Sequence, residues 1–261
     1  MSRSHLPRAS KRKRLSQNFL TDAALARRIV TESGVGPSDL VVEIGPGGGM
    51  LTRPLLERAG SVLAYEKDRH YAERLRSRLG HHDHFTVRLG DFRDADAPDE
   101  PFAVVANVPF AISTDIVRWC FDARALTSAD LLVQREFARK HAGGYGRWSK
   151  LAVTAWPHHR LSLGLRVHRE RFDPVPAVDG TILRIEHRER PLLPARAMRD
   201  YLDLVDLGFA GAGGSLTASL RRVVPPRLAY RACAEAGIAR DQPVGLVPPD
   251  RWIALFKALD S

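Results

Sequence analysis

The sequence LVVEIGPGGG at residues 40–49 carries the strongest indication of how this chain folds. Its first part, Leu40–Ile44, is a mostly apolar run that predicts a buried β-strand. Glycines at alternate positions, starting with Gly45 and Gly47, then permit a sharp turn and a close backbone approach to a ligand. A helical pattern continues to Ala59. Strand, glycine turn and helix in this order predict a nucleotide-binding β-α unit.

Further β-α units follow along the chain. Strands are predicted at Val62–Tyr65, Phe85–Leu89, Phe102–Ala106 and Leu131–Val133, with helical patterns between them. The last two strand candidates, Leu161–Val167 and Thr181–Ile185, lack an intervening helix and are expected to form an antiparallel hairpin at a sheet edge. Alternating strands and helices of this kind predict a doubly wound α/β domain.

A change in composition near Arg188–Pro194, rich in charge and proline, predicts a linker. Beyond it no strand pattern occurs, and short helices are expected at Met198–Phe209, Ser215–Val223, Arg227–Ala236 and Arg251–Leu259. We therefore expect three parts: a basic disordered arm at 1–14, an α/β domain at 15–187 and a small helical domain at 195–261.

Positive charge is the most informative bulk property. The net charge is +10, and 34 of the 40 basic residues are arginine. Such a chain is attracted to polyanions, and arginine binds phosphate bidentately and stacks on bases. The arginine-to-lysine ratio could reflect codon composition, but the excess of positive over negative charge could not. A nucleic-acid partner is therefore expected.

Metal, membrane and secretory roles are not indicated. Cys120 and Cys233 lack metal-ligand spacing, and His81–His84 is expected to lie in a polar loop, so no metal site is predicted. The longest apolar runs are too short to cross a bilayer, and the N-terminus lacks the apolar core of a secretory signal. A cytoplasmic location and no membrane partner are expected.

Acidic residues follow the second and third predicted strands. Glu66 lies 21 positions after Gly45, a spacing at which a carboxylate reaches the ribose hydroxyls of a bound adenosine. Asp91 can accept a hydrogen bond from an adenine amino group, while Phe92 packs against the base. Alternatively, Glu66 is an exposed charge and Asp91 a helix cap. Their place at successive strand ends favours an adenosine site.

The fourth strand ends in the motif Asn107–Phe110, NVPF. An exocyclic amino group of adenine is a poor nucleophile, because its lone pair is delocalised into the ring. Acceptors for its hydrogens return electron density to nitrogen and aim it at an electrophile. The side-chain oxygen of Asn107 and the carbonyl that precedes Pro109 supply two acceptors, and Phe110 offers a stacking face for a flipped base.

Together these motifs resemble the ribosomal RNA adenine N6-methyltransferases, which comprise the Erm resistance enzymes and the KsgA-type enzymes. The resemblance covers nearly the whole chain and includes Gln17–Leu20, Glu43–Leu51, Asn107–Thr114 and Phe172–Asp179. It implies a Rossmann-like class I methyltransferase sheet, S-adenosyl-L-methionine as cofactor, and an RNA-binding role for the small helical domain.

The resemblance also implies roles for single residues. Asn18 and Leu20 would lie over the methionine and ribose side of the cofactor, with Gly45 and Gly47 in the turn. Glu66 would bind the ribose and Asp91 and Phe92 the adenine. Asn107, Pro109 and Phe110 would form the catalytic motif, with Asn107 also contacting the cofactor and Phe110 stacking on the target base.

Three local features resemble the Erm branch more than the KsgA type. The motif has Val108 and Phe110 where the KsgA type usually has Leu and Tyr, residues 134–149 are similar to Erm sequences, and Gly213–Arg222 lacks an Arg-Arg-Lys-Thr-Leu stretch. The resemblance implies mono- or dimethylation of N6 of one adenine in 23S rRNA, naked or in an assembly intermediate. The result would be macrolide, lincosamide and streptogramin B resistance.

Basic residues predict where RNA binds. Arg135, Arg139, Lys140 and Arg147 follow the fifth strand and are expected to contact phosphates, although a solvated basic helix has the same composition. The arm at 1–14 should add affinity that falls with salt.

Other interpretations remain open. They are KsgA-type dimethylation of 16S rRNA, a non-catalytic RNA-binding assembly factor, and a nicotinamide-dependent oxidoreductase, which the early third glycine disfavours. A monomer is expected.

Overall fold

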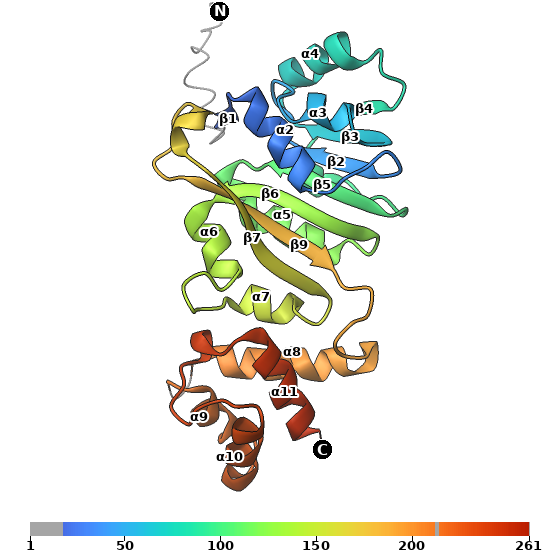
Figure 1. Cartoon of the computed structure of the whole chain (residues 1–261). Coiled ribbons are helices and arrows are strands. Elements are labelled where there is room, and N and C mark those ends of the chain that lie inside the picture. The colour runs from blue at the N-terminus through green and yellow to red at the C-terminus, as the bar shows by residue number, and fades with distance from the viewer. Residues whose placement is uncertain (1–17, 212–213, 261) are drawn as a thin grey trace, which may run out of the picture. The chain divides into compact units, whose positions relative to one another are not determined.

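The computed structural model describes residues 18–211 and 214–260 (Figure 1). The basic arm expected at 1–14, and the motif positions Gln17 and Gly213, lie outside the described residues. Contacts divide the chain into two compact units. The first runs to Arg135 and includes Gly164–Ile185; the second consists of Glu136–Leu163 and the residues from Glu186 onward.

A seven-stranded sheet organises the first unit and extends into the second. Its order is β4-β3-β2-β5-β6-β9-β7. The strands are β2 (Leu40–Ile44), β3 (Ser61–Glu66), β4 (Phe85–Leu89), β5 (Phe102–Asn107), β6 (Leu126–Gln134), β7 (His159–Val167) and β9 (Gly180–His187). The first five are parallel to one another, and β9 and β7 are neighbours at one edge, where the hairpin was expected. The predicted α/β class is confirmed.

Strand β2 is the centre of the first unit. Val41 and Val42 point to opposite faces and both are fully buried, so helices cover the sheet on both sides, as parallel sheets require. The chain proceeds from β2 to β3 and β4 on one side, and continues with β5 and β6 on the other. Strand order therefore reverses between β2 and β5, and ligands bind at the carboxyl ends of strands at such a point.

Short helices connect these strands. They are α2 (Ala23–Glu32), α3 (Thr52–Leu56), α4 (Arg69–Leu79), the 3-10 turns η1 (Phe92–Asp94) and η2 (Phe110–Ile112), and α5 (Ser113–Asp122). Helix α2 starts where the carboxylate of Asp22 accepts a hydrogen bond from the backbone N–H of Leu25. The apolar positions Ala26, Ile29 and Val30 face the core, as the helical spacing predicts.

A second, two-stranded sheet joins distant parts of the chain. Strand β1 (Phe19–Leu20) pairs antiparallel with β8 (Phe172–Asp173), which follows the 3-10 turn η3 (Arg169–Arg171). Phe19 lies opposite Asp173, and Leu20 opposite Phe172. The backbone N–H and the hydroxyl of Thr21 both donate to the carbonyl of Arg171, at 2.9 and 3.0 Å. Residues 18–21 are thereby held in an extended conformation.

The second unit is mostly helical. It contains most of α6 (Arg135–His141), then α7 (Lys150–Ala155), the turn η4 (Ala195–Ala197), α8 (Met198–Phe209), α9 (Leu216–Leu220), α10 (Pro226–Glu235), the turn η5 (Val244–Leu246) and α11 (Pro249–Leu259). Helix α7 packs against α8 and α11. The hydroxyl of Tyr201 donates to the carbonyl of Val153, and the indole N–H of Trp156 to Asp250. These contacts join residues 136–163 to the C-terminal helices, whereas the sequence placed them with the α/β domain.

Candidate active site

The glycine turn after β2 uses backbone conformations that favour glycine. Gly45, Gly47 and Gly49 have φ angles of 69°, 54° and 82°, in the left-handed region. The N–H of Gly45 donates to the carbonyl of Tyr65 on β3, which fixes the start of the turn. A Cβ atom at Gly47 would lie 2.5 Å from the ring of Phe19. The turn therefore needs glycine for its conformation and for the close approach of β1.

Glu66, at the end of β3, is oriented by the glycine turn. Its side chain is buried, and its carboxylate accepts hydrogen bonds from the backbone N–H of Gly47 at 2.9 Å and of Asp68 at 2.8 Å. Burial raises the pKa of this carboxyl, whereas the two N–H donors act in the opposite direction. Glu66 lines a cavity of about 560 Å³ and is therefore not the exposed charge of the alternative interpretation.

Asp91, at the end of β4, lines the same cavity but is already engaged by cations. The guanidinium of Arg93 donates to both carboxylate oxygens, at 3.0 and 2.6 Å, and the ammonium of Lys67 donates at 2.7 Å. These partners hold the pKa of Asp91 well below its usual range. Asp91 also caps η1 by accepting from the N–H of Arg93. The helix-cap interpretation thus describes one role of Asp91. Its position in the cavity wall also fits the predicted contact with an adenine amino group.

Other residues near the strand ends line this cavity as well. Phe92 is buried, with its ring edge-to-face to Trp119, and Gly90 and Pro109 contribute to the wall. A Cβ atom at Gly90 would meet nothing within 4 Å, so the cavity is open at that point. The cavity is broad and mostly apolar, with carboxylates on two adjacent strand ends. These features fit the adenosine part of a nucleoside ligand.

Asn107 ends β5 on the other side of the switch point. Its side-chain N–H donates a 2.8 Å hydrogen bond to the backbone carbonyl of Asn18. Among described residues, no hydrogen-bond donor to its side-chain oxygen is present. Because the nitrogen is fixed by Asn18, the oxygen is the group available as an acceptor. The next residue, Val108, is tied by its N–H to the carbonyl of Leu132 on β6, at 3.1 Å.

Phe110 follows the motif at the start of η2. Its side chain is half-buried, so it does not belong to the closed core. The ring lies edge-to-face to Phe172 of β8, with 6.5 Å between centroids. Phe172 is fully buried and holds one edge of the Phe110 ring. This contact orients Phe110 while part of its surface remains accessible.

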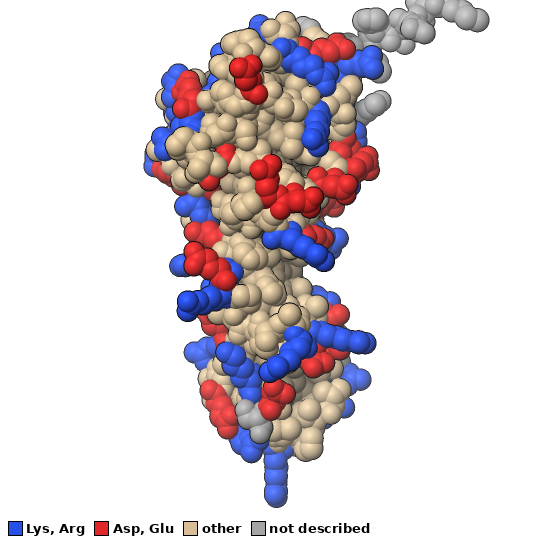
Figure 2. Space-filling model, turned by 90° about the vertical axis from the view of Figure 1, so that its right-hand side faces the viewer, with Lys and Arg blue, Asp and Glu red and all other residues tan. Residues whose placement is uncertain are grey.

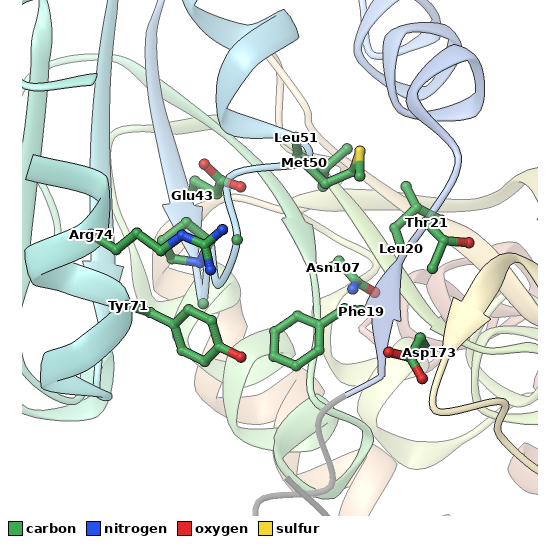
Figure 3. Close-up of a pocket in the computed structure, with 13 residues that line it drawn as sticks. Phe19, Leu20, Thr21, Glu43, Met50, Leu51, Tyr71, Arg74, Asn107 and Asp173 are labelled. Atoms are coloured by element: carbon green, nitrogen blue, oxygen red, sulfur yellow. The ribbon is translucent and has the colours of Figure 1, made fainter. Parts of the chain in front are cut away.

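A second cavity, of about 200 Å³, adjoins the glycine turn (Figure 3). Leu20 and Asn107 line it, and Gly45 lines both cavities. Figure 3 shows Phe19 of β1 and Tyr71 of α4 pointing toward one another, and their ring centroids are 5.3 Å apart. Asn18 and Gly47 contribute to the site indirectly. Asn18 is hydrogen-bonded to Asn107, and Gly47 is hydrogen-bonded to Glu66.

Glu43 is a site residue that the sequence did not single out. It is buried beside the smaller cavity, and Thr52 donates a 2.6 Å hydrogen bond to its carboxyl group. Burial raises its pKa to about 8, opposed by the Thr52 hydrogen bond and reinforced by the nearby Glu66 carboxylate. Glu43 therefore carries a proton at neutral pH. Glu43 lies inside the apolar run of β2. The strand pattern predicts that its side chain is buried, but it does not predict a role in the site.

Phe19, Tyr71, Arg74 and Asp173 also line the smaller cavity without having been predicted as ligands. Phe19 belongs to the segment Gln17–Leu20, whose resemblance to the family already indicated a place near the cofactor. Tyr71 and Arg74 lie three residues apart on α4. Residues at this spacing share a face on any helix, so the spacing does not indicate a ligand site. Asp173 belongs to the quoted segment Phe172–Asp179, and it reaches the site through the pairing of β8 with β1.

The predicted RNA-contact residues lie around α6 and the loop after it. Arg135 belongs to the first unit, and Arg139, Lys140 and Arg147 to the second. Arg139 is half-buried and donates to the carbonyl of Gly144, whereas Lys140 and Arg147 are exposed. Figure 2 shows basic and acidic side chains interspersed on the face in view, so the net positive charge does not cover that face uniformly.

No group of three His, Cys, Asp or Glu in residues 18–211 and 214–260 could hold a metal ion. In the same part of the chain, no helix is long and apolar enough to cross a membrane.

The sheet order, the glycine turn and the carboxylates at the strand ends define an S-adenosyl-L-methionine-dependent methyltransferase of the Rossmann-like class. The family model "Ribosomal RNA adenine dimethylase" matches residues 8–261. The chain therefore belongs to this family of ribosomal RNA adenine methyltransferases, and the resemblance found in the sequence is confirmed.

Individual relatives agree with this assignment. An rRNA adenine N-6-methyltransferase of Streptomyces fradiae is 46% identical over 95% of this chain and 78% of its own length. The mycinamicin-resistance protein MyrB of Micromonospora griseorubida is 37% identical, over 96% of this chain and 80% of that protein. The crystal structure of the 23S rRNA methyltransferase ErmE superposes with a TM-score of 0.89 at 41% identity, covering 94% of this chain and 100% of that one.

Proposed function

We propose that this enzyme methylates N6 of a specific adenine in 23S rRNA and thereby confers resistance to macrolide, lincosamide and streptogramin B antibiotics. One observation carries the chemistry: Asn18 fixes the side-chain nitrogen of Asn107, which leaves its oxygen as an acceptor at the switch point of the sheet. The relatives support the substrate, since ErmE is described as a 23S rRNA methyltransferase and MyrB as a resistance protein.

The two adjoining cavities fit S-adenosyl-L-methionine. The larger cavity presents the carboxylate of Glu66 for ribose hydroxyls, and Asp91 and Phe92 for the adenine. The smaller one would take the methionine part, with Leu20 and Asn107 in its wall. Gly45 lies at the junction, where a side chain would obstruct a ligand that spans both. Bound there, the cofactor supplies a methyl group on a positively charged sulfur.

The chain's own residues would position the amine. The side-chain oxygen of Asn107 and the carbonyl of Val108 each accept one hydrogen of the adenine amino group, which directs the nitrogen lone pair toward the cofactor side. Pro109 restricts the backbone that carries this carbonyl. Phe110 stacks on the flipped base, and its contact with Phe172 limits the ring's freedom. The product amine loses its proton to water, so no base of unusual pKa is required.

RNA binding would rest on the basic residues Arg135, Lys140 and Arg147, whose phosphate contacts position the substrate without reading its sequence. Arg139 would support the loop instead, because its guanidinium is already bonded to Gly144. The substrate would be naked rRNA or an assembly intermediate in the cytoplasm, and the enzyme would act as a monomer.

Two alternatives are separated by experiment. A KsgA-type enzyme would methylate 16S rRNA, and a non-catalytic assembly factor would bind rRNA without modifying it. Expression in a macrolide-sensitive bacterium tests the proposal directly. We expect the wild-type chain to raise the inhibitory concentration of erythromycin and to methylate one adenine of 23S rRNA, as mapped by mass spectrometry of nuclease fragments. The Asn107→Ala variant at equal expression should do neither. Methylation of 16S rRNA without resistance would favour the KsgA type.

A further inference from the structure

Tyr145 is the most exposed large aromatic residue in the described part of the chain, with 48% of its surface accessible. It lies in the loop between α6 and α7, within the second unit. Tyrosine combines an apolar ring with a polar hydroxyl group, and it is enriched at binding interfaces.

The ring is held on one face by an arginine. The guanidinium carbon of Arg139 lies 3.7 Å from the Tyr145 ring centroid, a stacked cation–π arrangement. The same guanidinium donates two hydrogen bonds to the carbonyl of Gly144, at 3.3 and 2.7 Å. The N–H of Gly144 returns a bond of 2.8 Å to the carbonyl of Arg139. Since Arg139 covers one face and about half the residue is still exposed, the other face is accessible to a ligand.

The loop that carries Tyr145 is built to hold one conformation. Gly143 and Gly146 have φ angles of 72° and 66°, and the N–H of Gly146 donates to the carbonyl of Gly143. The Gly143 backbone packs so closely on the Trp148 ring that a Cβ atom there would overlap it. The N–H of Trp148 donates to the carbonyl of Gly245, at 2.7 Å. A fixed ring loses little entropy when a ligand stacks on it.

The charges beside Tyr145 suit a polyanion. Lys140 and Arg147 are exposed, and no carboxylate forms an ion pair with either among the described residues. Glu136 is the only acidic residue between 136 and 149. An exposed ring with cations on both sides in sequence combines the two elements that bind single-stranded nucleic acid: a stacking face for a base and positive charge for its phosphates.

We propose that Tyr145 stacks on an unpaired base of the RNA substrate other than the adenine that receives the methyl group, while Lys140 and Arg147 bind the adjoining phosphates. This inference rests on the proposed function for the identity of the RNA. It adds a second base-binding position to the one assigned to Phe110. Arg139 is a positioning residue, which holds the Tyr145 ring and does not itself contact RNA.

Three variants test the stacking. Tyr145→Ala removes the ring, Tyr145→Phe keeps it, and Val223→Ala removes another exposed apolar side chain elsewhere in the same unit. With a protein-free 23S rRNA transcript, we expect Tyr145→Ala to raise both Kd and KM about 5- to 100-fold, with little change in kcat. Tyr145→Phe and Val223→Ala should resemble the wild type. Unchanged Kd and KM for Tyr145→Ala would overturn the proposal.

Salt dependence separates stacking from phosphate contact. The slope of log Kd against log salt should be the same for Tyr145→Ala as for the wild type, and smaller by about 1 for Arg147→Gln. Photo-crosslinking of a transcript that contains 4-thiouridine should label the peptide with Tyr145, and labelling only elsewhere would contradict the assignment. Since Kd is measured without methyl transfer, this test holds even if the wild type fails to methylate 23S rRNA, which would refute the proposed function instead.

Discussion

The side-chain nitrogen of Asn107 donates a hydrogen bond to the backbone carbonyl of Asn18, across 89 positions of sequence. The bond joins the catalytic motif at the end of β5 to the segment that enters β1. Because β1 is paired with β8, the carbonyl of Asn18 lies at the start of a fixed strand. The orientation of the Asn107 amide thus depends on three segments that are far apart in the chain.

Loss of the Asn107 amide should remove catalysis more than cofactor binding. Removing one preorganised hydrogen-bonding group from an active site lowers kcat by about 10²- to 10³-fold. We expect Asn107→Ala to show at least this loss in single-turnover methyl transfer, with a smaller loss in cofactor affinity by calorimetry. Asn107→Asp keeps an oxygen but loses the donor to Asn18, and should be intermediate. Near-normal turnover of the alanine variant would refute the assigned role.

Phe110 should act through its aromatic face. Stacking on a base is worth about 1–3 kcal/mol, so Phe110→Leu should lower kcat/KM for rRNA by about 5- to 100-fold. Phe110→Tyr retains the ring and serves as the matched control. Methyl transfer to protein-free rRNA measures both variants. If Phe110→Leu had wild-type kinetics, Phe110 would be only a packing residue beside Phe172.

Gly47 should tolerate no side chain. In Gly47→Ala, the new methyl group would meet Phe19 at 2.5 Å, with φ at +54°. We expect a loss of about 1–3 kcal/mol in the free energy of unfolding, measured by urea denaturation. Cofactor affinity should also fall, since the N–H of Gly47 orients Glu66. Gly48→Ala is the control for stability, because a Cβ there meets nothing within 4 Å. Equal stability of the two variants would contradict this account.

Glu43 should make stability depend on pH. Its pKa is raised from 4.5 to about 8 in the folded protein, so the folded state holds an extra proton between these values. The free energy of unfolding should therefore fall as pH rises through this window and level off above it. In Glu43→Gln this contribution is absent. Its Tm should be close to that of the wild type near pH 5 and higher by several degrees above about pH 8.

Thermal denaturation of both proteins across this range measures the effect. In Glu43→Gln, Thr52 can donate to the new amide oxygen as it does to the carboxyl group of Glu43, so the variant preserves the local contact. Parallel Tm curves for the two proteins would mean that Glu43 does not titrate in this window.

Local patterns in the sequence predicted much of the fold. Leu40–Ile44, Phe85–Leu89 and Met198–Phe209 have the expected bounds, because apolar runs and helical spacing are uninterrupted there. Strand β6 is longer than Leu131–Val133 and begins at Leu126. It contains at its middle the buried Asp130, whose charge is paired with Arg184 from β9 at 2.8 Å. No local pattern can show that a distant arginine permits a carboxylate inside a strand.

The site was predictable where motif and strand end coincide. Gly45, Glu66, Asp91 and Asn107 lie at or just after the ends of parallel strands that succeed one another in the chain, so one edge of the sheet brings them together. The engagement of Asp91 by Lys67 and Arg93 was not predicted, because it depends on side-chain conformations within a turn. The pairing of β1 with β8, two short strands from distant parts of the chain, was also missed.

The decisive measurement is methyl transfer from labelled S-adenosyl-L-methionine to protein-free 23S and 16S rRNA, with the modified nucleotide mapped. The proposed function predicts label on N6 of one adenine of 23S rRNA with the wild-type enzyme, and none with Asn107→Ala. Label confined to 16S rRNA, or none on either RNA, would contradict it.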